Sequence, residues 1–316
     1  MQGARKKALH HTINTPTTMN LASVDIGSNG ARMLVKSFSE GDPVQVKKEF
    51  FLRYPLRLGA DVFTLGKISK RKQKEMEHFL RIFTHLLALY QVEQYRACAT
   101  SAMRDAENGL KVMRKLKEQT GIQLEIIPGE EEAAMLCNNL VEKSDSNQGN
   151  FAYVDVGGGS TEVSIIHDGI LAESHSYNIG TLRMLGDRVS AATKISMQNG
   201  LYQAAKHFGS VQVIGSGGNI NKLCRLITQN KNATEFQVTD LQAIYDELRQ
   251  LSVEERMEKY FLRPDRADVI VPAAEIFLGI AAAFDCPKIV VPNISMADSI
   301  VDGIYKSMRD AANKDQ

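Results

Sequence analysis

Three short turns combine glycine with serine in a way that suits phosphate binding. They read GSNG at 27–30, GGGS at 157–160 and GSGG at 215–218. Glycine lets the backbone approach an anion closely, so successive amides can converge on one phosphate oxygen. Any one of these sequences is equally well explained as a tight turn. Three of them in one chain favour phosphate binding.

An aspartate precedes each of the first two turns, at the end of a strand-like run. Asp25 stands before the first turn and Asp155 before the second. Carboxylates can hold Mg²⁺ directly or through water while the neighbouring amides hold phosphate. The sequences around the two turns, DIGSNGARMLV from 25 and DVGGGSTEVSI from 155, look like two copies of one unit. This pattern predicts a duplication whose halves face each other across a cleft.

Three consecutive glutamates, Glu130, Glu131 and Glu132, follow Pro128 and Gly129 where a helix is predicted to begin. Acidic residues at this position oppose the helix dipole favourably, which accounts for such a group without any further function. Successive helical residues point about 100° apart, so at most one of these carboxylates can face a given cleft.

Other common catalytic motifs are missing from the sequence. No stretch reads GxxxxGK[ST] or GxSxG, and Ile220 occupies the position where a dinucleotide fingerprint has its third glycine. The seven histidines form no metal-binding set, because His78 and His85 are seven residues apart on one predicted helix and are interpreted as packing or surface residues. The basic run at 67–74 is followed by acidic residues, which indicates a solvated helix face.

The composition is that of a globular protein with no general affinity for polyanions. The 316 residues include 43% hydrophobic and 24% charged residues, and 38 Lys and Arg balance 37 Asp and Glu to a net charge of +1. We therefore expect no nucleic-acid or membrane partner, and any anion binding must be local. Four cysteines without paired spacing predict a reducing, cytoplasmic setting, and neither a signal peptide nor a membrane span is expected.

Helical and strand-like patterns alternate along the chain, which predicts an α/β fold. The predicted strands are 22–26, 31–38, 44–51, 95–99, 124–127, 151–156, 161–167, 211–214 and 288–291, and the predicted helices are 69–90, 108–119, 129–141, 219–228, two within 239–260, 266–284 and 296–308. Residues 1–18 are interpreted as a loose tail; the alternatives are a basic anchor for a partner and a true start at Met19.

Ordered motifs from about Leu21 to Tyr305 resemble those of the exopolyphosphatase/guanosine pentaphosphatase family, within the actin, sugar kinase and Hsp70 superfamily. The matching stretches are DIGSNGARMLV, RLGADV, GKIS, ATSAMRDAEN, IIPGEEEA, VDVGGGSTEV, IGTLRM, VIGSGGNI and ERMEKYFLRPDRADVI. The resemblance implies two ribonuclease H-like lobes around an interdomain cleft. It places 19–129 with 298–316 in the first domain and 130–297 in the second.

The resemblance also implies residue roles. By motif position Glu132 is the water-activating base, Asp155 and Glu162 join Asp25 as candidate ligands of Mg²⁺ or Mn²⁺, and Arg32 and Arg104 neutralise phosphate charge. The expected phosphate cradle consists of Ser28, Asn29, Gly157, Gly158 and Ser160, with Gly215, Ser216, Gly217 and Gly218 of the third turn. Phosphoryl transfer requires mainly positioning, charge neutralisation and one carboxylate to orient water, and these parts are all present.

The sequence departs from the family pattern at several positions. Gly30 stands where the first turn usually has a hydroxyl residue, Ser216 and Asn219 replace two threonines, and 300–303 lacks an expected arginine. These changes could weaken substrate binding without removing the catalytic carboxylates. The chain also ends without the C-terminal helical domain that is linked to long-polymer processing, so short polyphosphates are the expected substrates.

The resulting expectation is a hydrolase that removes the terminal phosphate of inorganic polyphosphate, with guanosine pentaphosphate as a second substrate left open. Two alternatives remain at this point. One is a nucleotide or alarmone sensor on the same scaffold with little catalysis, and the other is a kinase of the same superfamily that transfers phosphate from ATP to a sugar or acetate. A homodimer is compatible with the sequence.

Overall fold

The protein has two lobes, each built on one β-sheet. A computed structural model describes residues 18–39, 41, 43–142, 148–292 and 294–314. The first sheet has five strands in the order β3-β2-β1-β4-β5, and the second has six in the order β10-β11-β9-β6-β7-β8. The strands of the first sheet are β1 (Thr18–Ile26), β2 (Ala31–Ser39), β3 (Gln45–Tyr54), β4 (Gln94–Ala99) and β5 (Leu124–Ile126). Those of the second are β6 (Asn150–Val156), β7 (Thr161–His167), β8 (Ile170–Tyr177), β9 (Gln212–Ser216), β10 (Glu235–Gln237) and β11 (Lys288–Val290).

The two sheets repeat one topology. In the first, β1, β2 and β3 form an antiparallel meander, β4 pairs parallel with β1, and β5 pairs parallel with β4. In the second, β6, β7 and β8 form the same antiparallel meander, β9 pairs parallel with β6, and β11 pairs parallel with β9. The duplication predicted from the two aspartate-glycine units is therefore confirmed at the level of the sheets.

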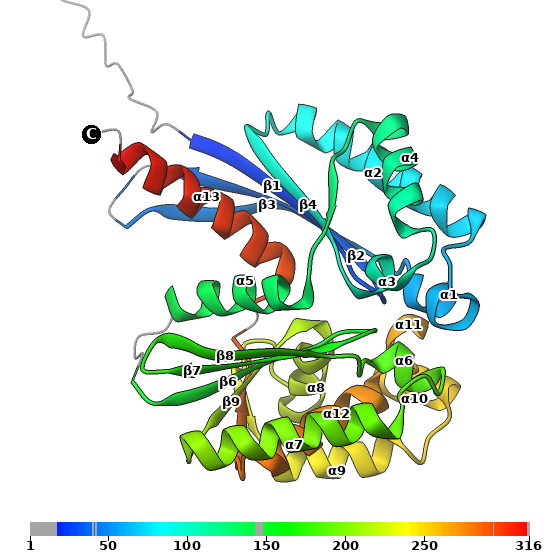
Figure 1. Ribbon diagram of the computed structural model, residues 1–316, viewed down its shortest axis with the longest axis vertical. Helices are drawn as coiled ribbons and strands as arrows, with labels where there is room; N and C mark the ends of the chain where they lie inside the picture. Colours follow the sequence, from blue (N-terminus) through cyan, green and yellow to red (C-terminus); the bar gives the residue numbers. More distant parts are fainter. Residues whose placement is uncertain (1–17, 40, 42, 143–147, 293, 315–316) are drawn as a thin grey trace, which may run out of the picture.

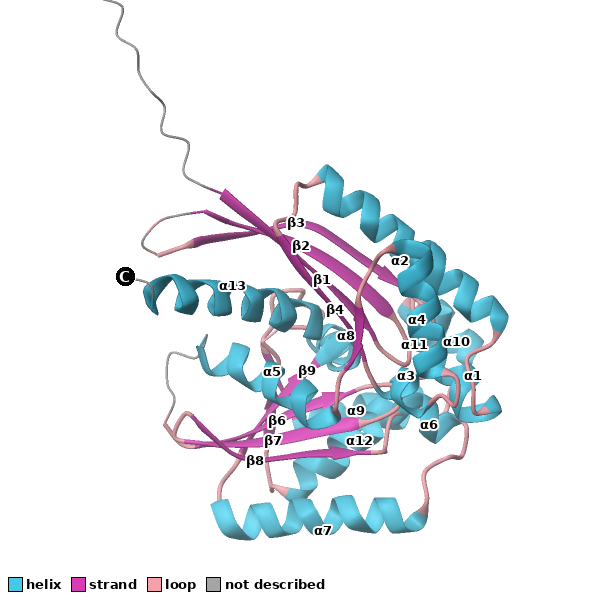
Figure 2. Cartoon of the chain, turned by 45° about the horizontal axis from the view of Figure 1, so that its top comes forward, coloured by secondary structure: helices cyan, strands magenta, loops and turns pink. Residues whose placement is uncertain are grey.

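Helices cover the outer faces of both sheets and fill the space between them (Figure 1). Near the first sheet are α1 (Leu58–Leu65), α2 (Lys70–Leu89), α3 (Ser101–Asp105) and α4 (Gly109–Thr120). Near the second are α6 (Thr181–Leu185), α7 (Ala191–Phe208), α8 (Gly217–Thr228), α9 (Val238–Leu248), α10 (Val253–Tyr260), α11 (Pro264–Ala267) and α12 (Ile270–Ala283). Between the sheets, α13 (Met296–Lys314) packs on β1 and β2 and on α5 (Gly129–Glu142), which packs on β7 and β8 (Figure 2).

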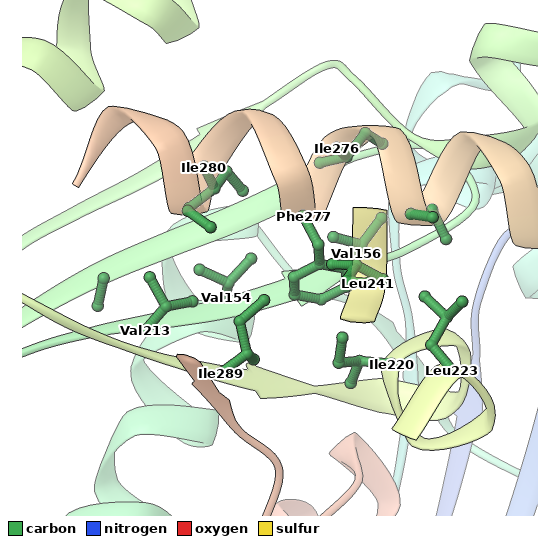
Figure 3. Close-up of a cluster of buried hydrophobic side chains, with 14 of the residues drawn as sticks. Val154, Val156, Val213, Ile220, Leu223, Leu241, Ile276, Phe277, Ile280 and Ile289 are labelled. Carbon is green, nitrogen blue, oxygen red and sulfur yellow. The ribbon is translucent and has the colours of Figure 1, made fainter. Parts of the chain in front are cut away.

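A dry core fixes the second sheet against its helices. Val154 and Val213 on the sheet face Phe277 and Ile280 of α12, and all four side chains are buried (Figure 3). Complete burial of a side chain of this size contributes about 1.5–3 kcal/mol. This packing holds the carboxyl ends of β6 and β9, from which two of the glycine-containing turns extend.

Most of the predicted elements are present, and the differences have physical causes. Helix α7 was not predicted, since few of its positions are apolar and buried and it contains Gly200, where a Cβ atom would lie 2.3 Å from the Tyr177 hydroxyl. The single helix predicted over 266–284 is instead α11 and α12, separated near Asp268, whose carboxylate accepts two hydrogen bonds from Arg57 at 3.2 and 2.5 Å. The elements α1, α3, β8, α6 and β10 were also not predicted.

Two predictions about the rest of the chain can be placed against the structure. The predicted tail at 1–18 lies outside the described residues except for Thr18, which begins β1. None of the helices in the described part of the chain combines the length and the apolar composition that a membrane span requires.

Candidate active site

The first two glycine turns have the same local structure and lie against each other. In the turn between β1 and β2, Gly27 N donates to Gly30 O at 3.0 Å, and in the turn between β6 and β7, Gly157 N donates to Ser160 O at 2.9 Å. A Cβ atom on Gly158 would lie 3.0 Å from Ser28 Cβ and 3.1 Å from the backbone nitrogen of Asn29. The close approach of the two lobes therefore favours glycine at 158, because a larger residue would crowd the opposite turn.

These turns enclose a polar cavity of about 60 Å³. We call it the catalytic cavity. Asp25, Glu132 and Asp155 all open into it, so the acidic groups on which the hydrolase interpretation depends lie around one space. Its walls are residues 27–30, Arg32, Arg53, Thr100, Ser101, 156–160, Gly218, Asn219, Arg266 and Met296.

The residue opposite each aspartate differs between the two hairpins. In the register of β1 with β2, Asp25 faces Arg32, and the Arg32 guanidinium donates a hydrogen bond to the Asp25 carboxylate. In the register of β6 with β7, Asp155 faces Glu162. The first hairpin thus presents an acid paired with a base, whereas the second presents two acids side by side, of which Glu162 is buried and Asp155 is half-buried.

Both acids of the second hairpin have a raised pKa. Burial raises the pKa of Asp155 to about 6, and the negative charge of Asp25 adds to the effect although Arg32 opposes it. Burial and the charge of Asp155 raise the pKa of Glu162 to about 7, against hydrogen bonds from serines that favour its ionised form. Ser176 Oγ is one of these donors, at 2.9 Å from Glu162 Oε1. A cation placed beside the pair would favour its ionised form.

Of the three glutamates at the start of α5, only Glu132 lines the catalytic cavity. Glu131 turns away to Arg96, 2.7 Å from its guanidinium, and Glu130 is exposed. Glu132 is buried, and its Oε2 atom has no hydrogen-bond partner among the residues that the structure describes. Burial, followed by the charges of Glu162, Asp155 and Asp25, raises the pKa of Glu132 well above its usual value. A buried acceptor without a donor is costly in an empty site and suited to an incoming water molecule.

Two arginines that the sequence interpretation did not single out complete the cavity wall. Arg53 of β3 lies 2.6 Å from Asp265, and the Arg266 guanidinium donates to Asn219. Burial lowers the pKa of Arg266, and the neighbouring Arg53 and Arg32 lower it further. Arg266 lies within the RPDRADVI motif, which was a signal for it, whereas Arg53 belongs to no motif. With Arg32, they gather three guanidinium groups around a space of phosphate size.

Two residues predicted to bind phosphate, Arg104 and Gly215, do not line the catalytic cavity. Arg104 instead donates to Ile127 O at 2.7 Å, and its charge partly opposes the rise in the pKa of Glu132 and of Glu162 that burial causes. Gly215 is a packing residue: a Cβ atom there would lie 2.8 Å from Ile220.

The rest of the third turn lies against the acid pair. Ser216 lines a smaller cavity of about 10 Å³, together with Asp155 and Glu162. Gly217 has φ +90°, and a Cβ atom on it would lie 2.3 Å from Asp155 Oδ1. Gly218 lines the catalytic cavity itself.

The acidic side chains around the catalytic cavity can supply some, but not all, of the ligands of a divalent metal ion. Within the described ranges, no group of three or more His, Cys, Asp and Glu side chains is arranged to hold a metal ion by itself. Mg²⁺ is usually held by one or two carboxylates, with waters and substrate phosphate oxygens completing its shell. Asp155 and Glu162 form no ion pair with any residue that the structure describes, and together they fit such a partly protein-held ion.

Ion pairs and hydrogen bonds join the lobes around the catalytic cavity. Arg57 binds Asp268, and Asn29 Nδ2 donates to Asp265 O at 3.1 Å. Arg183 lies 2.5 Å from Asp105, and its guanidinium carbon lies 4.2 Å from the centre of the Phe63 ring. These contacts hold the two glycine turns in register with each other.

Comparison with known proteins gives one family. A model of the Ppx/GppA phosphatase family matches residues 52–307. Exopolyphosphatase 1 of Mycobacterium tuberculosis is 31% identical over 147 residues, which are 46% of this chain and 42% of that protein. The bifunctional 3-dehydroquinate synthase/phosphatase of Fusobacterium nucleatum is 29% identical over 171 residues, which are 52% of this chain and 25% of that protein. The chain therefore spans less than half the length of these curated relatives.

Solved structures agree with this result at the level of the fold. The Aquifex aeolicus member of the Ppx/GppA protein family superposes with a TM-score of 0.75 and 22% identity, covering 92% of this chain and 99% of that chain. An exopolyphosphatase from Cytophaga hutchinsonii superposes with a TM-score of 0.81 and 21% identity, covering 92% of this chain and 98% of that chain.

Proposed function

The chain belongs to the Ppx/GppA phosphatase family, and from this premise we propose that it hydrolyses the terminal phosphoanhydride bond of inorganic polyphosphate. The observation that carries the proposal is the convergence of Asp25, Glu132 and Asp155 on one cavity walled by glycine amides and arginines. This arrangement supplies anion binding and a buried carboxylate in the same space. Both are needed to direct water at a phosphorus atom.

The glycine turns and the arginines hold the terminal phosphate. Backbone amides of 157–160 can point at phosphate oxygens at no cost in side-chain entropy, and Ser28 Oγ is buried without a partner among the described residues. Arg32, Arg53 and Arg266 supply the positive charge that offsets the phosphate oxygens. Their planar forks match two oxygens at once, which orients the terminal group as well as binding it.

Glu132 acts as the base that activates water. Its carboxylate lines the cavity, and its free Oε2 can accept a hydrogen bond from a water molecule placed in line with the scissile bond. A raised pKa makes this carboxylate a stronger base in its ionised form than an exposed glutamate. The proton of the attacking water passes to Glu132, and the leaving phosphate chain takes the electron pair of the broken P–O bond.

We include Mg²⁺ or Mn²⁺ in the proposal. Asp155 and Glu162, with Asp25 across the cleft, are the residues that would hold the ion. When bound, it would offset the charge of the phosphate oxygens and of the leaving group. In its absence the same acids repel one another, which is why they fit a cation better than an empty site.

The finer parts of the proposal concern the range of substrates and the setting. We propose short polyphosphates as the main substrates and guanosine pentaphosphate as a second one, since both present a terminal phosphoanhydride bond to the same cavity. Four buried free cysteines agree with the reducing cytoplasm expected from the sequence.

Phosphate release from tripolyphosphate by the purified protein with Mg²⁺ tests the proposal. We expect turnover by the native protein and a loss of two to three orders of magnitude in kcat for Glu132→Gln, about the effect of removing a general base. The control is Glu130→Gln, a change of the same kind on the exposed side of the same helix turn.

The possible results separate the hydrolase from its alternatives. Equal turnover by Glu132→Gln and Glu130→Gln would contradict the role of Glu132. Saturable binding of tripolyphosphate without phosphate release by the native protein would favour the sensor. Transfer of phosphate from ATP to an added sugar or acetate would favour the kinase.

A further inference from the structure

Gly30 closes the first glycine turn, and the space beside it is occupied by Arg53. Gly30 is buried and does not have a positive φ, so its backbone conformation alone does not require glycine. A Cβ atom at this position would lie 3.2 Å from Arg53 Nη2, 3.3 Å from Nε and 3.4 Å from Cζ. All three are guanidinium atoms. A side chain at 30 and the Arg53 guanidinium would therefore compete for the same space.

Arg53 reaches this space from β3 and is held there by the second lobe. In the register of β2 with β3, Arg53 is opposite Arg32, so both side chains emerge on the same face of the first sheet. Its guanidinium forms an ion pair with Asp265 of α11 at 2.6 Å, and only 14% of the Arg53 side chain and 7% of the Asp265 side chain are exposed. Asn29, the residue before Gly30, also donates to the backbone oxygen of Asp265. The guanidinium is thus fixed between the first glycine turn and α11.

One nitrogen of the Arg53 guanidinium lacks an acceptor. Nε is buried and has no hydrogen-bond partner among the residues that the structure describes, whereas Nη2 faces Asp265. Burial lowers the pKa of Arg53, Asp265 opposes this effect, and the like charges of Arg32 and Arg263 add to it. A buried donor of this kind is costly until an acceptor reaches it. Because Arg53 lines the catalytic cavity, a phosphate oxygen in that cavity can be the acceptor.

Arg57 shows by contrast how an arginine joins the lobes without serving the cavity. It also pairs with an aspartate of the second lobe, but both of its terminal nitrogens donate to Asp268, at 3.2 and 2.5 Å. It does not line the catalytic cavity. An ion pair between the lobes therefore accounts for the whole of the Arg57 arrangement, whereas for Arg53 it leaves the free Nε and the glycine at 30 unexplained.

We propose that Arg53 contacts the terminal phosphate from the space that a side chain at 30 would fill, and that glycine at 30 is the condition for this contact. Arg53 is then a substrate-binding residue, and Gly30 and Asp265 are positioning residues that act through it. The inference rests on the proposed function, because the anion is the reacting end of the same substrate. In this arrangement a charged group replaces the hydroxyl that the first turn lacks, so the glycine does not weaken substrate binding.

The test measures two quantities. One is the dissociation constant of inorganic phosphate by calorimetric titration with Mg²⁺ present, and the other is KM with kcat for phosphate release from tripolyphosphate. Arg53→Lys keeps a cation for Asp265 but loses Nε and the planar fork. We expect about tenfold weaker phosphate binding and about tenfold higher KM, the effect of losing one charge-assisted hydrogen bond, with a change in kcat of less than about threefold.

A double-mutant cycle tests the dependence on Gly30. Gly30→Val should weaken phosphate binding about tenfold in the native protein, because it displaces the guanidinium, and should have little further effect in the Arg53→Lys background. Gly30→Ala should give a smaller change in the same direction, and it takes the place of Gly30→Val if that variant does not fold. Gly27→Ala is the matched control in the same turn, because the nearest atom to its added Cβ is Gly30 O at 3.4 Å, an ordinary contact. Its effect should be equal in the two backgrounds.

Arg57→Lys is the matched control for the arginine. It also keeps a cation for an aspartate of the second lobe, and it changes a residue outside the walls of the catalytic cavity, so phosphate binding should not change. Equal thermal unfolding midpoints of Arg53→Lys and Arg57→Lys show that a difference in phosphate binding does not come from a loss of contact between the lobes.

The outcomes separate this inference from the proposed function. If Arg53→Lys and Arg57→Lys bind phosphate equally well, or if the effects of Gly30→Val and Arg53→Lys multiply to about a hundredfold, the inference is overturned, while phosphate release by the native protein keeps the function. A fall in kcat at unchanged phosphate affinity also overturns it, because Arg53 would then only hold the lobes together. If the native protein releases no phosphate, the function fails, and the phosphate titrations, which require no turnover, decide the inference by the same criteria.

Discussion

The turn between β1 and β2 and the turn between β6 and β7 share a backbone and differ in charge. Both follow a strand that ends in aspartate, and both close with a hydrogen bond from the first glycine to the fourth residue. Seven residues after the aspartate, the first hairpin has Arg32 and the second has Glu162, each directly opposite its aspartate in the strand register. The two copies of the hairpin therefore share a backbone but carry different charges, and both line the same cavity.

This difference divides the chemistry between the lobes. Asp25 and Arg32 form an ion pair, so the first hairpin can offer guanidinium nitrogens to a phosphate without leaving a bare acid behind. Asp155 and Glu162 have no such ion-pair partner among the described residues. Their charge is therefore neutralised either by protons or by a bound cation. In the proposed function, both glycine turns contribute to phosphate binding, but only the first hairpin adds a guanidinium, that of Arg32, and the second supplies Asp155 and Glu162, two of the three candidate metal ligands.

The largest expected effect comes from neutralising the aspartate of the second hairpin. Asp155→Asn should lower kcat for phosphate release by about a thousandfold, since it removes charge from the centre of the proposed ion site. Its thermal unfolding midpoint should not fall, because a neutral side chain avoids the cost of removing a charge from water, which is the main cause of the raised pKa, and also the repulsion by Asp25. Turnover within tenfold of the native protein would mean that the acid pair is structural.

Replacing the residue opposite each aspartate by glutamine distinguishes the roles of the two hairpins. Arg32→Gln should raise KM for tripolyphosphate by about a hundredfold, the effect of losing a charge-assisted contact, and leave the Mg²⁺ requirement unchanged. Glu162→Gln should raise the Mg²⁺ concentration for half-maximal activity by about tenfold and affect KM less. Steady-state titrations of substrate and of Mg²⁺ measure both. If both variants change mainly KM, or both change mainly the Mg²⁺ requirement, the two hairpins do not have separate roles.

The comparison also explains which parts of the site could be predicted from the sequence. The two hairpins were visible because aspartate and glycine stand at fixed spacing within each turn, and the position of Glu132 inside a helix limited the glutamate run to one useful side chain. Arg53 was not visible, because its place in the cavity depends on how β3 packs against the second lobe through Asp265. Local spacing identifies residues of one turn, whereas contacts between lobes leave no local signal.

The same limit applies to the fold. Strands and helices with a regular apolar pattern were predicted, including α2 and the meander of each sheet. Helix α7 was not, because Met197 and Leu201 are among its few buried apolar residues and its place in the fold depends on packing against α12. Within the third turn, composition alone could not distinguish Gly215, which packs in the core, from Gly217, which lies against Asp155.

Gly217 tests how closely the third turn supports the second hairpin. Gly217→Ala introduces a Cβ atom 2.3 Å from Asp155 Oδ1 in a backbone with φ +90°, so we expect both a loss of stability of about 3 kcal/mol and at least tenfold lower kcat. Gly209→Ala is the control, because Gly209 also has a positive φ of 73° but no atom within 4 Å of the added Cβ. Urea unfolding and phosphate release measure the two effects. Equal losses in the two variants would show that backbone strain alone matters at 217.

Asp298 shows how a buried aspartate behaves when the fold supplies its cations. Burial alone would raise its pKa, yet Lys36 and Lys48 with a hydrogen bond from Ser295 lower it to about 2 from a usual value of 3.8. The Lys36 and Lys48 ammonium groups lie 3.0 and 2.7 Å from its carboxylate. Asp155 has the opposite shift although it is less buried than Asp298, so the neighbouring charges and not burial by itself decide the charge of an acid here.

The smallest expected effect follows from that difference. A pKa lowered from 3.8 to about 2 corresponds to about 2 kcal/mol of stability near neutral pH, which Asp298→Asn should remove. Because the folded pKa lies below the unfolded one, this contribution is complete above the unfolded value and is lost as the pH falls through the folded value. The difference in unfolding free energy between native and variant proteins should therefore shrink between pH 4 and pH 2. Asp310→Asn, an exposed change on the same helix, should show no such dependence, and a native-to-Asp298→Asn difference independent of pH would mean that the lysines do not hold Asp298 ionised.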